Sequence, residues 1–264
     1  MINHDYYLNN ANLNNKFEKQ ILEVGLKKNK LLNKYQNNLY YLFYPKNSDL
    51  QNLLQHLTLI KISFTLKKPF ISKDEGQFHI LDNKITENPI VRDKFTLLPI
   101  VKSSTWKGHL RFAAEKVDWN QEKPLIIKRL FGSEPEEEQN QLKGRLYFFP
   151  TFFKKQTDKD IITPLKRDTR TPARGPISLE VIKPENESEF YLLYFPYPTG
   201  DAFKEEDIQN DLKFLVKALQ LMFYTYGFSA KKTSGFGVIK KLKENEVEVY
   251  PEDKKTLFAS LYTL

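Results

Sequence analysis

Residues 204–226 repeat apolar side chains at the spacing of a long helix, and this stretch constrains the fold more than any other. Successive apolar residues are separated by 4, 3, 4, 3 and 4 positions, and they are Ile208, Leu212, Leu215, Leu219, Met222 and Tyr226. This spacing places all six on one face of a helix, so we expect that face to be packed against a core. Gly227 is expected to end the helix, because glycine commonly follows the last helical residue.

A strand is predicted over residues 57–67, where apolar and polar residues alternate. Side chains two residues apart lie on the same face of a strand, so one face of this segment is apolar and the other is polar. The apolar face holds Ile60, Ile62, Phe64 and Leu66. Pro69 is expected to end the strand.

Further elements alternate along the chain and together predict the fold class. They begin with a strand over 97–101, a helix over 103–117, a short helix over 125–131 ended by Gly132, and an aromatic strand over 144–153. Strands over 177–182 and 190–195 follow, and these two could pair across the turn 184–188. The last elements are a strand opened by Gly235 and a tail with a short strand over 247–250 and a helix over 256–264. The order strand, helix, strand, strand, helix, strand indicates an α+β fold with an antiparallel sheet, in the ferredoxin-like arrangement.

The chain is expected to divide into two parts. Residues 1–52, rich in Asn and Lys, predict a helical N-terminal extension, and residues 53–264 predict one domain. Two long polar segments, 72–94 and 153–175, are expected to protrude from it, since loops of this length are commonly functional or disordered.

Charge and aromatic content together suit nucleic acid. The 264 residues carry 41 Lys and Arg against 33 Asp and Glu, a net charge of +8, and 14% are aromatic. Cations attract phosphates and rings can stack on bases. The ordinary alternative is that most of the rings belong to the core.

Other classes of protein are disfavoured by composition. The chain has no cysteine and four histidines without metal-ligand spacing, so disulfides and a structural zinc site are not expected. The longest apolar run is too short to span a membrane, and the first residues lack the charge pattern of a secretory leader. We therefore expect a soluble, cytoplasmic protein without a membrane partner.

Two segments resemble signature regions of a known family. The first is 98–111, Leu-Pro-Ile-Val-Lys-Ser-Ser-Thr-Trp-Lys-Gly-His-Leu-Arg, and the second is 227–237, Gly-Phe-Ser-Ala-Lys-Lys-Thr-Ser-Gly-Phe-Gly. They resemble the RAMP superfamily of CRISPR-associated proteins, particularly subunits of type III effector complexes. Leu130-Phe131-Gly132 resembles a further family element between them. The first segment departs from the family pattern, because Lys102-Ser103 replaces its Pro-Gly.

The resemblance implies a ferredoxin-like, RRM-like RAMP core that binds guide RNA (crRNA) through its backbone, together with target RNA and other CRISPR effector subunits, in antiviral defence. It implies RNA contacts by the helix start, the glycine-rich loop and a thumb-like hairpin over 154–174. The residues concerned are Ser104, Thr105, Lys107 and Arg111, then Lys231, Lys232 and Gly235, and in the hairpin Lys166, Arg167, Arg170 and Arg174.

Elementary chemistry agrees with these roles but also allows ordinary ones. Free N–H groups, hydroxyls and a lysine at a helix start form a phosphate site, and glycines allow close backbone approach. The same residues suit a hydroxyl N-cap, a glycine C-cap and a solvated basic loop.

Catalysis stays open at this stage. The resemblance implies that backbone subunits of type III complexes are metal-dependent endoribonucleases with an Asp after the first strand, and Asp82 is the residue best placed to hold Mg²⁺. Asp82 could equally be an exposed loop residue, since aspartate is mostly exposed. The alternatives are a non-catalytic capping subunit of the same complex and, less favoured, a guide-RNA-processing endonuclease that uses His109.

Overall fold

The computed structural model of the chain describes most residues beyond position 37. The described ranges are 38–50, 57–72, 79–81, 84–86, 89–133, 141–154, 157–166, 168–173, 175–197, 205–231 and 234–263.

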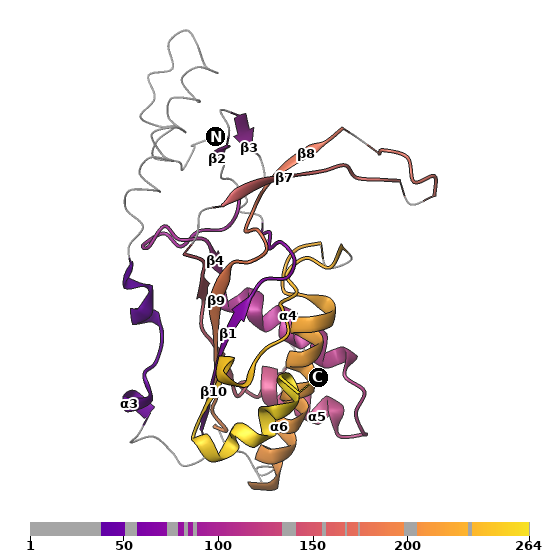
Figure 1. Ribbon diagram of the computed structural model, residues 1–264. Coiled ribbons are helices and arrows are strands. Elements are labelled where there is room, and N and C mark those ends of the chain that lie inside the picture. The colour runs from indigo at the N-terminus through magenta and orange to yellow at the C-terminus, as the bar shows by residue number, and fades with distance from the viewer. Residues whose placement is uncertain are drawn as a thin grey trace.

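A four-stranded antiparallel sheet forms the centre of the molecule (Figure 1). Its strands are β1 (Thr58–Thr65), β5 (Leu146–Phe148), β9 (Glu187–Tyr194) and β10 (Val247–Tyr250). Their spatial order is β10-β1-β9-β5, and each neighbouring pair is antiparallel. The α+β class with an antiparallel sheet, predicted from the sequence, is confirmed.

Helices cover one face of this sheet (Figure 1). They are α4 (Ser103–Lys116), α5 (Lys123–Phe131) and α6 (Glu205–Gln220), and α6 continues as a π-helical turn, η2 (Leu221–Tyr226). The order β1, α4, β5, β9, α6, β10 is strand, helix, strand, strand, helix, strand. Ile60, Ile62 and Phe64 of β1 are buried in the main core between these layers.

The long helix predicted over 204–226 is confirmed, and so is its end. Gly227 follows η2 with a φ of 72°, and Gly132 follows α5 with a φ of 94°. Glycine adopts positive φ without a steric penalty, which explains why both helices end there.

The strand predicted over 247–250 is confirmed as the last strand of the sheet, whereas the strand predicted to open at Gly235 is wrong. We expected Gly235 to open a strand, but residues 235–237 form a turn, and Ile239 makes a single bridge to Leu66. The strand that pairs with β1 is β10, which follows a short 3₁₀ turn, η4 (Glu244–Glu246). Gly235 and Gly237 both have positive φ, which suits a turn and not an extended strand.

A two-stranded arm extends from one end of the sheet (Figure 1). It is formed by β7 (Asp158–Ile162) and β8 (Ile177–Val181). The expected pairing of 177–182 with 190–195 is wrong, because β9 pairs with β1 on one side and β5 on the other. Both edges of β9 are therefore used, and β8 pairs with β7.

The predicted 72–94 loop contains a small hairpin, β2 (His79–Leu81) and β3 (Lys84–Thr86). A second short pair joins β4 (Ile100–Val101), which precedes α4, to β6 (Thr151–Phe152), which follows β5. The tail predicted as a helix is a 3₁₀ helix, η5 (Glu252–Leu261).

The predicted extension over 1–52 lies largely outside the described residues, including its expected helix. Its described part forms η1 (Asn38–Phe43) and α3 (Asn47–Leu50). Tyr44, between them, stacks on Tyr191 of β9 with ring centroids 4.0 Å apart. This segment therefore lies on the sheet face opposite the helices. Among the described residues, no helix is long and apolar enough to cross a membrane.

Candidate nucleic-acid interface

The start of α4 lacks the hydroxyl cap that the sequence suggested. Lys102 occupies the N-cap position, with a φ of −63° and a ψ of 148°, and makes no side-chain cap hydrogen bond. The helix begins at Ser103, so Ser103, Ser104 and Thr105 lie inside its first turn instead of before it. The first N–H groups of a helix have no partner within it. A helix start without a side-chain cap is suited to an anionic ligand.

Trp106 fixes this helix start to the sheet. Its ring is fully buried, and its Nε1 donates to Thr151 Oγ1 at 3.0 Å. The same hydroxyl donates to the backbone oxygen of Glu189 in β9 at 2.8 Å. With Trp106 turned inward, its neighbour Lys107 is exposed, as is Ser104. The packing therefore places a cation and a hydroxyl at the surface beside the helix N-terminus.

The described residues of the glycine-rich loop, 227–231 and 234–237, are folded tightly against the segment that follows β1. A Cβ on Gly227 would lie 2.2 Å from Phe236 O, and one on Gly237 would lie 2.7 Å from Ser229, so both positions require glycine. The Ser229 hydroxyl donates to Ile71 O at 2.9 Å and accepts from Ile71 N at 2.8 Å.

Two other residues of the loop face outward. Gly235 has a φ of 72°, but a Cβ there would meet nothing within 4 Å. Lys231 is exposed and has a φ of 62°. The loop therefore has open space at Gly235 beside an exposed cation, as its predicted role requires.

The two motif regions, far apart in the sequence, meet in the core. The Trp106 ring lies 4.3 Å from the Phe228 ring, between centroids. Phe228 also packs on Phe70, at 5.7 Å, in the segment after β1. The helix start and the glycine-rich loop thus share one aromatic cluster at one end of the sheet.

The arm emerges at the same end. Phe236 of the glycine-rich loop packs with Ile71 and with Leu179 and Val181 of β8. Beyond β7 and β8 the two segments of the arm are joined by a turn, next to which Leu165 makes a β-bridge with Pro172 and Lys166 N donates to Thr171 O at 2.8 Å. The side chains of Lys166 and Arg170 are exposed at this turn. Arg170 has a φ of 57°.

Sequence reasoning missed two further exposed cations in this region. Lys67 and Lys68 follow β1, and both backbone N–H groups donate to Val238 O, immediately after the glycine-rich loop. Lys102, which the first motif already includes, precedes α4 and is also exposed. The signal was the basic pair directly before Pro69, at the end of the strand that leads to both motifs.

Arg111 and His109 fit their predicted roles less directly. Arg111 is half-buried, and its Nε lies 3.7 Å from Glu115 Oε1 along the helix. It borders a hollow of about 550 Å³ between α4 and α5. His109 is also half-buried in α4. Both side chains therefore lie farther from solvent than Lys107.

Four candidate residues lie outside the described part of the chain: Asp82, Arg167, Arg174 and Lys232. Nothing in the structure therefore tests a role for Asp82 in holding Mg²⁺. Within the described ranges, no group of three or more acidic or histidine side chains could hold a metal ion.

The sheet face opposite the helices has a different character. Lys61 lies 3.0 Å from Glu248 and 3.3 Å from Glu189. Burial lowers the pKa of Lys61, but its hydrogen bond to Glu248 and the nearby charges outweigh burial, and the pKa is raised overall. Lys61 is therefore paired with two carboxylates on a face that Tyr44 partly covers, and this arrangement is unfavourable for phosphates.

One comparison with known proteins, the match to a family model, agrees with the resemblance of the motifs. The model of the RAMP superfamily matches residues 64–240, which is more than half of the chain. No curated protein matches the sequence. Among solved structures, the chain is similar to one in "Cryo-EM structure of the Type III-B Cmr-beta bound to cognate target RNA", with 17% identity and a TM-score of 0.49 over 88% of this chain and 72% of that chain. The family match shows that the chain belongs to the RAMP superfamily.

Proposed function

We propose that the protein is a guide-RNA-binding subunit of a type III CRISPR effector complex, and that it holds the RNA by its sugar–phosphate backbone. The observation that supports this most is the convergence of the helix start, the glycine-rich loop and the arm at one end of the sheet. Membership of the RAMP superfamily and the resemblance of both motifs to those of type III subunits support the same assignment.

The chemistry of this end of the sheet favours phosphates over bases. Exposed lysines flank a helix N-terminus without a side-chain cap and a glycine with open space around it. Lysines and helix N–H groups bind phosphates, and the glycine lets the sugar–phosphate backbone approach closely, so none of these contacts depends on the identity of the base. Sequence selection would then depend on pairing by the guide RNA itself, as in other RNA-guided complexes.

The open sheet face is less suited to RNA. Many RNA-binding domains with a four-stranded sheet stack bases on aromatic residues of that face. Here Tyr191 already stacks on Tyr44, and carboxylates surround the lysine beside it. We therefore assign RNA to the end of the sheet and not to its face.

Cleavage of target RNA is a separate proposal, which rests on Asp82. If Asp82 holds Mg²⁺, Asp82→Ala abolishes one cut at a defined spacing in the assembled complex while guide binding is retained. Unchanged cuts would instead favour the capping alternative. The processing alternative requires pre-guide cleavage by the isolated protein, and that cleavage should then depend on His109.

The binding proposal is tested with the full-length protein and single-stranded RNAs of unrelated sequence. We expect equal affinities for the different sequences and a linear fall of log affinity with log salt concentration, because phosphate contacts release counterions. Absence of binding at low salt would overturn the proposal, as would a strong preference for one base sequence.

A further inference from the structure

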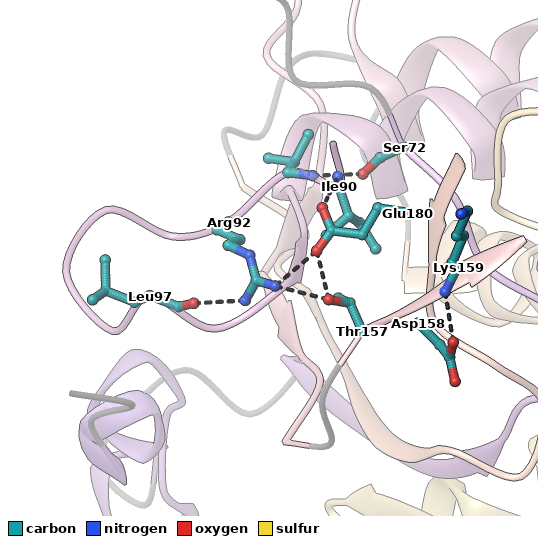
Figure 2. A network of polar contacts seen from close by, with 9 residues as sticks. Ser72, Ile90, Arg92, Leu97, Thr157, Asp158, Lys159 and Glu180 are labelled. Carbon is teal, nitrogen blue, oxygen red and sulfur yellow. Dashed lines mark hydrogen bonds and ion pairs between the residues drawn. The ribbon is translucent and has the colours of Figure 1, made fainter. Parts of the chain in front are cut away.

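One buried carboxylate holds the base of the arm. Glu180 of β8 is 1% exposed and accepts three hydrogen bonds (Figure 2). Its Oε2 accepts from Ile90 N at 2.8 Å, and its Oε1 accepts from Arg92 Nη2 at 2.9 Å and from the Thr157 hydroxyl at 2.5 Å. We call these four residues the Glu180 cluster.

The cluster joins three segments that are distant in sequence. Thr157 immediately precedes β7 and Glu180 lies in β8, so both strands of the arm are held at their base. Ile90 and Arg92 belong to the segment between β3 and β4. Arg92 extends the connection, since its Nη1 donates to Leu97 O at 3.2 Å and its Nη2 to Thr157 Oγ1 at 3.0 Å (Figure 2).

The two faces of the arm's base are held in different ways. Successive side chains of a strand point to opposite faces. Leu179 and Val181 pack on Ile71 and Phe236, beside the glycine-rich loop. Glu180 lies between them in the strand, points to the other face and contacts the other three residues of the Glu180 cluster. Without the cluster, the base would keep the packing of Leu179 and Val181 and the bridge between Ile182 and Phe70, but it would lose its contacts with the segment between β3 and β4.

Small rotations at the base are amplified at the turn. Lys159 of β7 lies directly opposite Glu180 of β8 in the strand register. Farther along the arm, a β-bridge joins Leu165 to Pro172. At about 3.3 Å per residue, this bridge lies about 20 Å beyond the base, so a rotation of about 10° would move the turn by about 3.5 Å. That movement is large enough to separate Lys166 and Arg170 from a phosphate.

We propose that Glu180 is a positioning residue, which sets the direction of the arm so that the turn cations and the helix start can hold one RNA backbone together. This inference rests on the proposed function, since it assumes that the bound ligand is RNA. Glu180 itself is buried and contacts no RNA. Its effect is exerted through the arm.

The direction of the arm can be measured without RNA. The chain has no cysteine, so Gly108→Cys in α4 and Asp168→Cys at the turn allow two spin labels to be attached selectively. A side chain at position 108 meets open space, and Asp168 is exposed. We expect a narrow distance distribution in this background. Adding Glu180→Gln should about double its width, because the base then loses the charged contacts that hold it to the segment between β3 and β4.

RNA binding by the unlabelled full-length protein then tests whether the Glu180 cluster contributes to RNA affinity. Glu180→Gln removes a negative charge, which by itself would tighten RNA binding slightly. Our inference predicts the opposite sign, a loss of about tenfold, because the arm no longer acts together with the helix start. The slope of log affinity against log salt concentration should also become shallower by about 1.4 if two phosphate contacts to single-stranded RNA are lost. Asp168→Asn, which removes a charge outside the cluster, serves as the control and should not weaken binding.

A second pair of variants avoids any change of charge. Thr157→Val removes the hydroxyl and should broaden the distances and weaken RNA binding, whereas Thr157→Ser keeps the hydroxyl and should preserve both. Unchanged distance distributions in Glu180→Gln and Thr157→Val would overturn the inference. Broadened distances with unchanged RNA affinity would also overturn it. If the unaltered protein binds no RNA, the proposed function fails instead, and the distances still report whether the cluster directs the arm.

Discussion

The described part of the molecule has two buried carboxylates, Asp211 and Glu180, that lie toward opposite ends of the sheet, and each accepts hydrogen bonds from arginine. Asp211 of α6 is fully buried and accepts from Arg129 at 2.7 and 3.0 Å, from Arg145 at 3.1 Å and from the Tyr194 hydroxyl at 3.0 Å. Glu180 is nearly as buried and accepts from Arg92, a threonine and a backbone N–H. The groups are alike, but the elements that they connect differ.

Asp211 connects elements that the core already packs together. Arg129 lies in α5, Tyr194 in β9, and residues of α5, α6 and β9 share the main apolar core. Burial raises the pKa of Asp211, and the contacts with Arg129 and Arg145 oppose burial by favouring the ionised form. Glu180 connects segments at the margin of the fold, where a smaller apolar cluster supports one face. We infer that the first network stabilises the fold and the second directs the arm.

The largest effect is expected from Asp211→Ala. Removing this carboxylate leaves Arg129 and Arg145 buried without the charged acceptor that they share, which costs about 3 to 5 kcal/mol of unfolding free energy. Denaturant unfolding should show a lower midpoint for the whole protein. Asp207→Ala is the matched control, because Asp207 lies 3.6 Å from Arg129 and is partly exposed. It should cost about 1 kcal/mol or less. Equal losses in the two variants would contradict a structural role for the buried network.

A smaller and local effect is expected from Glu180→Gln. Loss of the charged acceptor should cost about 1 to 3 kcal/mol, since hydrogen bonds to a charged group are replaced by weaker ones. Hydrogen exchange should accelerate at the Ile90 amide and along β7 and β8, while the amides of α6 stay protected. In Asp211→Ala the α6 amides should instead lose protection. Acceleration throughout the sheet in Glu180→Gln would remove the distinction between the two networks.

The sequence predicted the part of the fold that local patterns encode. The apolar repeat before Gly227 predicts the long helix, and the alternation over 57–67 predicts β1, because each pattern involves neighbours along the chain. The helix start and glycine-rich loop were also identified, and the structure places both at one end of the sheet through Trp106 and Phe228.

The pairing of distant segments could not be predicted in the same way. The partners of β8 depend on which edges β9 has left unused, and that depends on β1 and β5. Glu180 and Arg92 are 88 residues apart, and no local spacing marks either of them as a partner of the other. Glu180 lies between two apolar residues of a strand, which predicts an exposed side chain. The surrounding segments bury it instead.

The smallest effect on stability, and a selective effect on binding, is expected from Lys107→Ala and Lys231→Ala. Both side chains are exposed, so neither change should alter the unfolding free energy by more than about 0.5 kcal/mol. If each lysine contacts one phosphate of a single strand, each variant should reduce the salt dependence of RNA binding by about 0.7. Lys213→Ala, an exposed lysine of α6, is the control and should leave the salt dependence unchanged.

Combining these two variants with Glu180→Gln sharpens the comparison between the networks. Lys107 and Lys231 lie on elements joined by the main core, so their phosphate contacts should persist when the Glu180 cluster is broken. The reductions in salt dependence should then add to that of Glu180→Gln. Non-additive reductions would mean that the Glu180 cluster positions the helix start and the glycine-rich loop as well as the arm. The division between a rigid core site and a separately directed arm would then be wrong.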